Sequence, residues 1–181
     1  MIRLTTFAAL AAAFAMASSA TAQTLDNSAG TGKTVILSPL NFINDTDLNF
    51  GSVVLPTGVN GSVQIDPDPS VVGFMTATGV LPIPTSVPTR GIMVGAGSAL
   101  TDVTVTTAFP SLLYLNGDTT STVTLPVSLT VDAAPVAPDT YTYTIDSGQA
   151  FQVFVGGTVG IPAGSADGSY SNTYTITATY P

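Results

Sequence analysis

The last fourteen residues of the chain, 168–181, alternate between two kinds of side chain with a period of two. Ser or Thr occupies every odd position from 171 to 179. The even positions carry mainly aromatic and aliphatic side chains: Tyr170, Asn172, Tyr174, Ile176, Ala178 and Tyr180. Because successive side chains of a strand point to opposite faces, this pattern predicts a β-strand with one apolar face and one hydroxyl face. The apolar face continues to the penultimate residue, so we expect a core to cover it.

The rest of the chain has the composition of an all-β protein. All eleven acidic residues are Asp, which caps turns, and none is Glu, which favours helices. Beyond residues 1–22, no stretch combines helical apolar spacing with helix caps. Short β-type runs separated by turn residues predict a single all-β domain, residues 33–181, with a sandwich architecture.

The N-terminus has the three parts of a secretory signal peptide. Arg3 supplies a positive start, residues 4–17 are apolar, and Ala20, Thr21 and Ala22 form a cleavage site of the A-x-A type. The apolar run is shorter than the roughly 20 residues of a membrane-spanning helix. We therefore predict cleavage after Ala22, export without membrane insertion, and a mature chain that begins at Gln23. No cysteine follows the signal to carry a lipid anchor.

The mature N-terminus allows two interpretations. Residues 23–32 form a polar, Gly-containing leader, and residues 33–37 form a strand-like run. Apolar side chains occur at odd positions, but polar ones interrupt them at Asn27, Thr31 and Lys33. The segment is either a strand donated to another chain or the first strand of its own domain.

The residue inventory excludes most catalytic and ligand-binding chemistry. The chain has eleven acidic and three basic side chains, so it would repel nucleic acids and anionic membranes. It has no His, Cys or Glu, so neither a Ser-His-Asp triad nor a His or Cys metal site can be formed. We expect no catalytic, metal or cofactor site. A hydrolase that uses Asp alone is the remaining enzymatic alternative.

Several local motifs are expected to be structural. The acidic pairs at 45 and 47 and at 66 and 68 resemble calcium ligands, but turn capping is the better interpretation. Asn60 and Gly61 predict a hairpin turn between strands, and Asn116 and Gly117 predict a turn after residues 112–115. We interpret the adjacent glycines at 156 and 157 as a turn between two strands, and Arg90 as a solvated loop residue. Residues 66–90 are rich in proline, which predicts loops and edge strands.

Two motifs near the ends of the mature domain resemble a known family. The first is Asp-Leu-Asn-Phe-Gly at 47–51, and the second is Val-Gly-Gly-Thr at 155–158, followed by the alternating C-terminal stretch. Together they resemble the secreted proteobacterial domain-of-unknown-function family 4402. The C-terminal stretch is also similar to that of spore-coat-U-type pilins of archaic chaperone-usher systems, with Gly168 fourteenth from the end and Tyr180 penultimate.

The resemblance to pilins implies a fold and a function. The implied fold is an immunoglobulin-like β-sandwich that lacks one strand, with a groove filled first by a periplasmic chaperone and then by the N-terminal extension of a neighbouring copy. The chain would then be a structural or adhesive subunit of a cell-surface fibre, assembled with an outer-membrane usher. The implied strand-exchange and chaperone-recognition residues are Gly168, Tyr170, Tyr174, Ile176, Ala178 and Tyr180. The alternative is a free-standing binding or matrix domain that does not polymerise.

Overall fold

A computed structural model describes residues 34–181, and within it Ile36–Pro181 form one compact unit. The predicted signal peptide, the leader 23–32 and Lys33 lie outside the described residues. The described part is all-β and contains no helix long and apolar enough to cross a membrane. Its strands are β1 (Asn41–Thr46), β2 (Val53–Val54), β3 (Gly61–Ile65), β4 (Met75–Thr78), β5 (Leu81–Pro82), β6 (Gly91–Ala96), β7 (Asp102–Ala108), β8 (Leu112–Leu115), β9 (Thr124–Val131), β10 (Pro135–Ala137), β11 (Thr140–Thr144), β12 (Ala150–Ile161), β13 (Tyr170–Ser171) and β14 (Thr175–Thr179).

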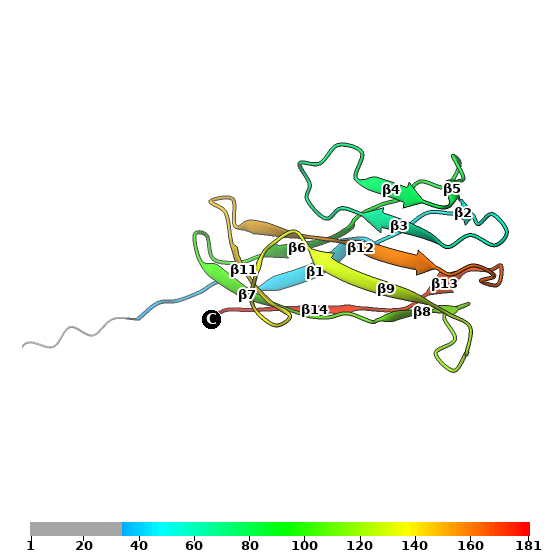
Figure 1. The fold of residues 1–181 in the computed structure, drawn as a ribbon. Coiled ribbons are helices and arrows are strands. Elements are labelled where there is room, and N and C mark those ends of the chain that lie inside the picture. Colours follow the sequence, from blue (N-terminus) through cyan, green and yellow to red (C-terminus); the bar gives the residue numbers. More distant parts are fainter. Residues whose placement is uncertain (1–33) are drawn as a thin grey trace, which may run out of the picture. The chain divides into compact units, whose positions relative to one another are not determined.

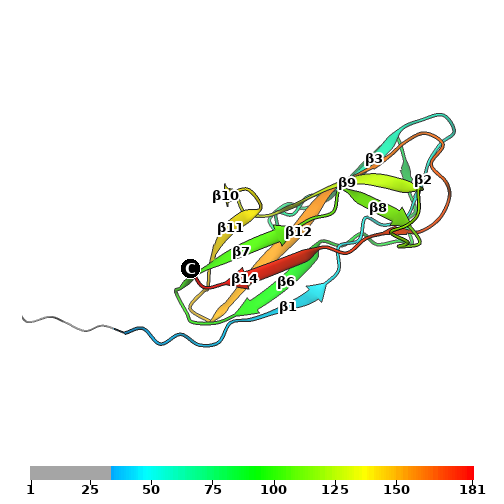
Figure 2. The same cartoon turned by 90° about the horizontal axis from the view of Figure 1, so that it is seen from below.

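The strands form two main antiparallel sheets, which confirms the expected β-sandwich (Figures 1 and 2). The larger sheet has the order β1-β6-β12-β9-β8-β13, and β3 and β4 extend it beside β12. The smaller sheet has the order β10-β11-β7-β14. Strands β2 and β5 pair separately as a short ribbon.

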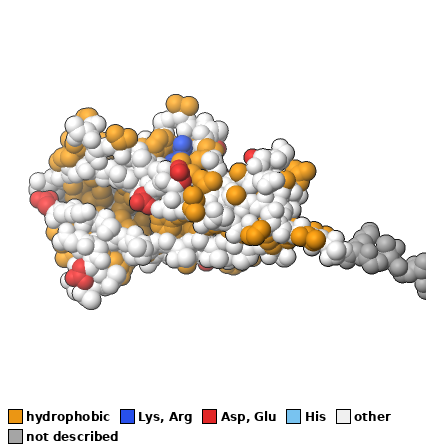
Figure 3. Space-filling model, turned by 180° about the vertical axis from the view of Figure 1, so that it is seen from behind, with side chains coloured by type: hydrophobic (Ala, Val, Ile, Leu, Met, Phe, Trp, Pro, Cys, Tyr) orange, Lys and Arg blue, Asp and Glu red, His pale blue; other side chains and the backbone are white. Residues whose placement is uncertain are grey.

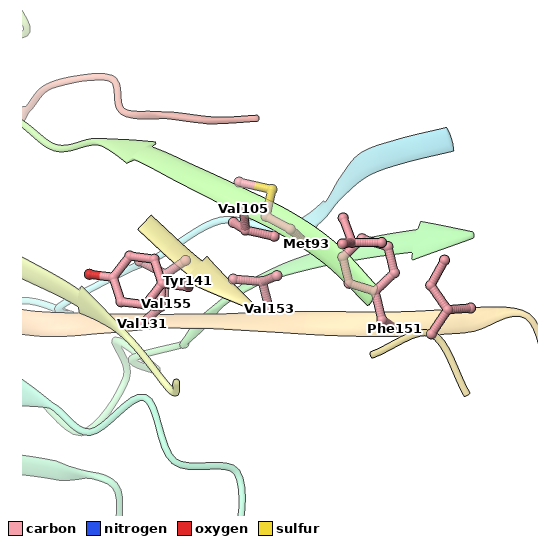
Figure 4. Close-up of a cluster of buried hydrophobic side chains, with 9 residues drawn as sticks. Met93, Val105, Val131, Tyr141, Phe151, Val153 and Val155 are labelled. Carbon is pink, nitrogen blue, oxygen red and sulfur yellow. The ribbon is translucent and has the colours of Figure 1, made fainter. Parts of the chain in front are cut away.

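Apolar side chains from the two sheets form the core in two clusters. The first cluster contains Met93 of β6 and β-branched or aromatic residues of β7, β9, β11 and β12, several of which are drawn in Figure 4. The second contains residues of β3, β9 and β12. Val103 and Val105 of β7 are fully buried, whereas Thr106, which follows Val105, is exposed. The strand therefore alternates as its sequence predicts.

The long strand β12 replaces two predicted strands and the turn between them. Gly156 and Gly157 lie inside this strand, so the turn predicted there is wrong. Before the glycines β12 pairs with β6, and after them it pairs with β3 on the same side. A Cβ on Gly156 would lie 2.3 Å from the carbonyl oxygen of Ile65, and one on Gly157 would lie 2.2 Å from that of Ser128. The pair therefore permits close backbone approach where β12 exchanges partners.

Two other local predictions are also wrong. Residues 34–37 are not a strand, and the first strand begins at Asn41. Asn60 and Gly61 do not form a hairpin turn, because Gly61 begins β3 and the chain turns earlier, where the amide of Val59 donates to the carbonyl of Pro56. Strand β2 pairs with β5 instead of β3. This long-range pairing cannot be predicted from the Asn-Gly dipeptide alone.

Turns are predicted correctly where a side chain binds the backbone of a residue close to it in the chain. Asn116 and Gly117 both have positive φ and follow β8 as a turn. The Oδ1 of Asp66 accepts a hydrogen bond from the amide of Asp68, and the Oδ1 of Asp68 accepts one from the amide of Ser70. These carboxylates cap a turn, as expected from the preference of Asp for such positions.

Arg90 is not the solvated loop residue that the sequence suggests. Its guanidinium donates hydrogen bonds to the carbonyls of Asp66, Asp68 and Val71 at 2.6, 2.7 and 2.9 Å. It also lies 4.3 Å from the centre of the Phe74 ring. Arg90 thus holds the loop between β3 and β4 in one conformation.

Candidate strand-docking groove

The C-terminal stretch forms two strands in different sheets instead of one. Strand β13 pairs with β8 in the larger sheet, and β14 pairs with β7 in the smaller one. The change occurs at Asn172, whose side-chain amide donates to the carbonyl of Leu112 and whose Oδ1 accepts from the amide of Thr173. The side-chain amide of Asn172 thus binds two backbone groups that a continuous strand would pair with backbone. The stretch can therefore leave one sheet and join the other.

The predicted alternation of the stretch persists through this break. The six even-numbered side chains from 170 to 180 are partly buried, and the odd-numbered ones between them are exposed. Tyr174, Ile176, Ala178 and Tyr180 pack against the first core cluster, while Tyr170 packs against the second. Gly168 is exposed, has a φ of +152°, and approaches Leu115 so closely that a Cβ would lie 2.4 Å from its Cδ1.

Unpaired strand edges flank the partly buried side chains on both sides. Within residues 34–181, β14 pairs only with β7, β13 only with β8, and β1 only with β6. Side chains preceding and within β1, Leu40 and Phe42, pack on the same core cluster as those of β14. Two sheets therefore present free edges over one shared core, and such edges have backbone groups available for another strand.

A cavity of about 600 Å³ adjoins these edges: Tyr170 and Ser171 of β13 line it, whereas no residue of β1 or β14 does. One wall is the segment after β1, from Leu48 to Val53, and the opposite wall includes residues 165–172 and Tyr174. Its floor consists of core side chains: Val63, Leu113, Leu125, Leu129, Val159 and Ile161. Figure 3 shows an apolar hollow between two lobes at the left of the view. We call the cavity, together with the free edges of β1 and β14, the groove.

Tyr174 is the last residue of the C-terminal stretch that lines the cavity. Its hydroxyl is buried and has no hydrogen-bond partner among the described residues. The hydroxyl lies 2.6 Å from the position that a Cβ on Gly91 would occupy, and Leu48 borders the same point, so the ring reaches from the β14 side to the larger sheet. Burial raises the pKa of Tyr174, and the nearby carboxylate of Asp47 raises it further.

The hydroxyl of Tyr180, the residue after β14, binds two segments that are distant in the chain. The hydroxyl accepts a hydrogen bond from the amide of Ser98 and donates one to the carbonyl of Ser38, both at 2.8 Å. The amide of Ser38 in turn donates to the Oγ of Ser98 at 2.6 Å. These contacts join the C-terminal end of β14 to the segment that precedes β1.

The predicted site residues therefore all border the groove, but sequence reasoning missed half of it. The residues 48–53 on the opposite wall and the floor residues Leu113, Leu125 and Leu129 were not predicted as site residues. Leu48 and Phe50 do share one face in the sequence pattern, which was the available signal. In the described residues no group of three or more acidic side chains could hold a metal ion. The floor of the cavity is apolar, whereas its walls include polar residues such as Asn49, Asp167 and Asn172.

A sequence model of the family described as "Domain of unknown function (DUF4402)" matches residues 40–180. The match includes β1, β14 and every wall of the cavity. No curated protein matches the chain. No solved structure matches it either.

Proposed function

The chain belongs to the DUF4402 family, and on that premise we propose that it is an exported pilin-like structural or adhesive subunit of a cell-surface fibre. Its groove is completed by a β-strand from another chain. The protein is not an enzyme in this proposal. Binding is by main-chain pairing and by insertion of alternate side chains into the groove.

One observation carries the proposal: free strand edges from two sheets lie over one core, and a cavity with an apolar floor adjoins them. Antiparallel β14 and β1 each lack a second neighbour among the described residues, and the side chains between them are only partly buried. An added strand would pair with one of these edges, and its continuation would enter the adjoining cavity of about 600 Å³. Ordinary sandwiches protect such edges with charges, bulges or covering loops.

The proposed partners are a periplasmic chaperone, an outer-membrane usher and further copies of the chain. Residues 1–22 have the features of an export signal, which would bring the chain to the periplasm and then to the cell surface. The excess of acidic side chains disfavours nucleic acid as a partner. The similarity of the C-terminal stretch to pilins of archaic chaperone-usher systems supports the same set of partners.

The alternative is a free-standing binding or matrix domain, and one observation favours it. Strand β14 already pairs with β7 over five residues, and its apolar side chains contact the core without a donor strand. A domain of this kind would fold unaided, and its groove would be a ligand site.

Strand complementation is tested by adding a donor strand to the same chain. Residues 23–40 are fused after Pro181 through a flexible linker, and thermal unfolding of this chain is compared with that of residues 23–181. We expect the midpoint to rise by at least about 4 °C, since about 1 kcal/mol shifts the midpoint of a domain this size by about 2–4 °C. The fused chain should also stay monomeric, because the donor acts intramolecularly.

The control carries the same 18 added residues in scrambled order. Equal midpoints for all three chains, each monomeric, would contradict strand complementation and leave the free-standing domain as the better account. Material sheared from the cell surface gives a second comparison by native mass analysis. A fibre subunit gives a ladder of multiples of its mass, and a free-standing domain gives a single species.

A further inference from the structure

The second core cluster is open to solvent through the cavity. Most of the partly buried side chains that pack against this cluster also line the cavity: Phe50, Val53, Leu55, Leu113, Leu129 and Tyr170. An apolar surface left open in a concave site is typical of sites for small molecules. The volume of about 600 Å³ is also within the usual range for such sites.

The charge around the cavity restricts what can enter it. Among the described residues that line the cavity, Asp167 is the one carboxylate, and none is lysine or arginine. The one basic side chain within residues 34–181 is Arg90, which is bound to carbonyls of the loop between β3 and β4. An anionic head group would therefore meet a carboxylate and no cation, on a chain with a formal charge of −8. This arrangement disfavours fatty acids, phosphates and other anions.

Hydroxyl groups border the same opening. Ser52 on one wall and Ser169 and Ser171 on the other line the cavity, and all three residues are exposed. A serine hydroxyl both donates and accepts hydrogen bonds, so it can bind a neutral hydroxyl group without a charged partner. We call these three serines the rim. The lining thus combines an aliphatic floor with a neutral rim that can form hydrogen bonds.

We propose that the cavity binds an uncharged amphipathic molecule, whose aliphatic body lies on the floor and whose hydroxyl group lies at the rim. Asp167 disfavours anionic analogues of this molecule. The inference does not rest on the proposed function, because one chain supplies both the floor and the rim. The continuation of an added strand would compete with the molecule for the same volume.

The head group is tested with octanol and octanoate, which have aliphatic chains of similar size and differ in charge. Each is titrated into isotope-labelled residues 23–181, and the chemical shifts of the backbone amides are followed. We expect saturable shifts with octanol in the residues that line the cavity. Octanoate should bind at least about threefold more weakly, since an exposed carboxylate repels it. Hexanol should also bind more weakly than octanol, because each buried CH₂ strengthens binding by up to about fourfold.

A bulky side chain on the cavity wall tests the location. Ser52→Trp places an indole in the cavity from an exposed position, so it should abolish the octanol shifts while the chain stays folded. The matched control is Ser128→Trp, which is exposed on β9 and does not line the cavity. Its affinity for octanol should equal that of the unmodified chain.

Charge reversal tests the role of Asp167. Asp167→Lys should strengthen octanoate binding by about threefold or more and leave octanol binding unchanged, because only the charged head group responds. The control Asp102→Lys makes the same change in net charge at an exposed residue of β7 that does not line the cavity. Equal effects of the two variants on octanoate would show that Asp167 does not select against anions.

Three results would overturn the inference: no saturable octanol binding, equal affinities for octanol and octanoate, or unchanged octanol binding in Ser52→Trp. These measurements use the chain without a fused donor strand. If the fused strand raises the unfolding midpoint but octanol does not bind, strand complementation stands and this inference fails. If octanol binds as expected and the midpoint does not rise, the inference stands and strand complementation fails.

Discussion

Two adjacent glycines determine how closely three strands of the larger sheet approach one another. Gly156 and Gly157 lie where β12 passes between the carbonyls of Ile65 and Ser128. At this point β12 exchanges β6 for β3 while it stays paired with β9. Backbone atoms surround both positions, so the neighbours cannot move aside as a flexible side chain would. The requirement for glycine is therefore one of space as well as of backbone conformation.

We predict that Gly157→Ala destabilises the protein far more than Gly58→Ala. Both glycines have positive φ, at +148° and +76°, but a Cβ at 157 would lie 2.2 Å from the Ser128 carbonyl oxygen, whereas nothing lies within 4 Å at 58. Gly58→Ala should cost about 1–2 kcal/mol, the cost of a left-handed conformation. Gly157→Ala should exceed that cost because strands must also separate. Urea unfolding measures both, and equal costs would contradict the role of close approach.

Arg90 gives a second prediction at the scale of one residue. Its planar guanidinium donates to three carbonyls of the loop between β3 and β4, a geometry that the single ammonium group of lysine does not reproduce. Arg90→Lys should therefore lower the free energy of unfolding by about 1–3 kcal/mol, in the range of charge-assisted hydrogen bonds. Hydrogen exchange should accelerate in residues 66–74. Unchanged exchange in this loop would mean that Arg90 does not hold it.

At the scale of the element, the structure of the C-terminal stretch depends on its local alternation and on one contact with a distant residue. The period of two places Ile176 and Ala178 inward and Thr175, Thr177 and Thr179 outward. The division into β13 and β14 depends instead on Asn172, which binds Leu112 in a different part of the chain. The same stretch thus borders the groove along most of its length.

We predict that Ile176→Ala and Thr177→Ala, adjacent changes on opposite faces of β14, have unequal costs. Ile176 is partly buried against the first core cluster, so its truncation should cost about 2 kcal/mol, the lower end for a large-to-small core change. Thr177 is exposed, and its replacement should cost less than about 1 kcal/mol, the span of strand propensities. Chemical denaturation of both variants gives the comparison. Similar costs would mean that this face of β14 does not pack on the core.

At the scale of the whole molecule, the absence of histidine and cysteine governs the dependence of stability on pH. No side chain with an ordinary pKa between about 5 and 9 is present, so protonation should not change the fold in that range. Titration is confined to Asp at low pH and to Tyr and Lys at high pH.

We therefore predict a plateau of stability with losses at both extremes. Hydrogen bonds from Ser70 and Thr120 lower the pKa values of Asp68 and Asp118, so stability is present above about pH 4 and is lost as pH falls through the lowered values. Burial and the hydrogen bond to Asp132 raise the pKa of Tyr143, so the folded state holds that proton more tightly than the unfolded state. Stability then decreases as pH rises above about 10.

Urea midpoints measured from about pH 2 to about pH 11 check this profile. Tyr143→Phe is the control for the alkaline side, because it removes the titrating hydroxyl that donates to Asp132. Its midpoint should fall less steeply above about pH 10 than that of the unmodified chain. A sloping midpoint between about pH 5 and about pH 9 would contradict the plateau.

The sequence by itself determined the fold class, the inward and outward faces of the strands, and the turns capped by their own side chains. These features depend on neighbours within a few residues, as in the alternation of 168–181 and the turn at Asn116 and Gly117. Family membership also follows from motifs at both ends of the domain. The predicted residues of the groove were those on its C-terminal wall.

Only the tertiary structure decided which edges pair and which stay free. The partner of β2, the passage of β12 at Gly157, the contacts of Arg90 and the division at Asn172 all join segments distant in the chain. A residue's own neighbours do not specify such contacts, because the free energy of pairing depends on what the rest of the chain places opposite. The free edges exist for the same reason: β1 and β14 are each locally ordinary strands, and both pack on one core without a second neighbour among the described residues.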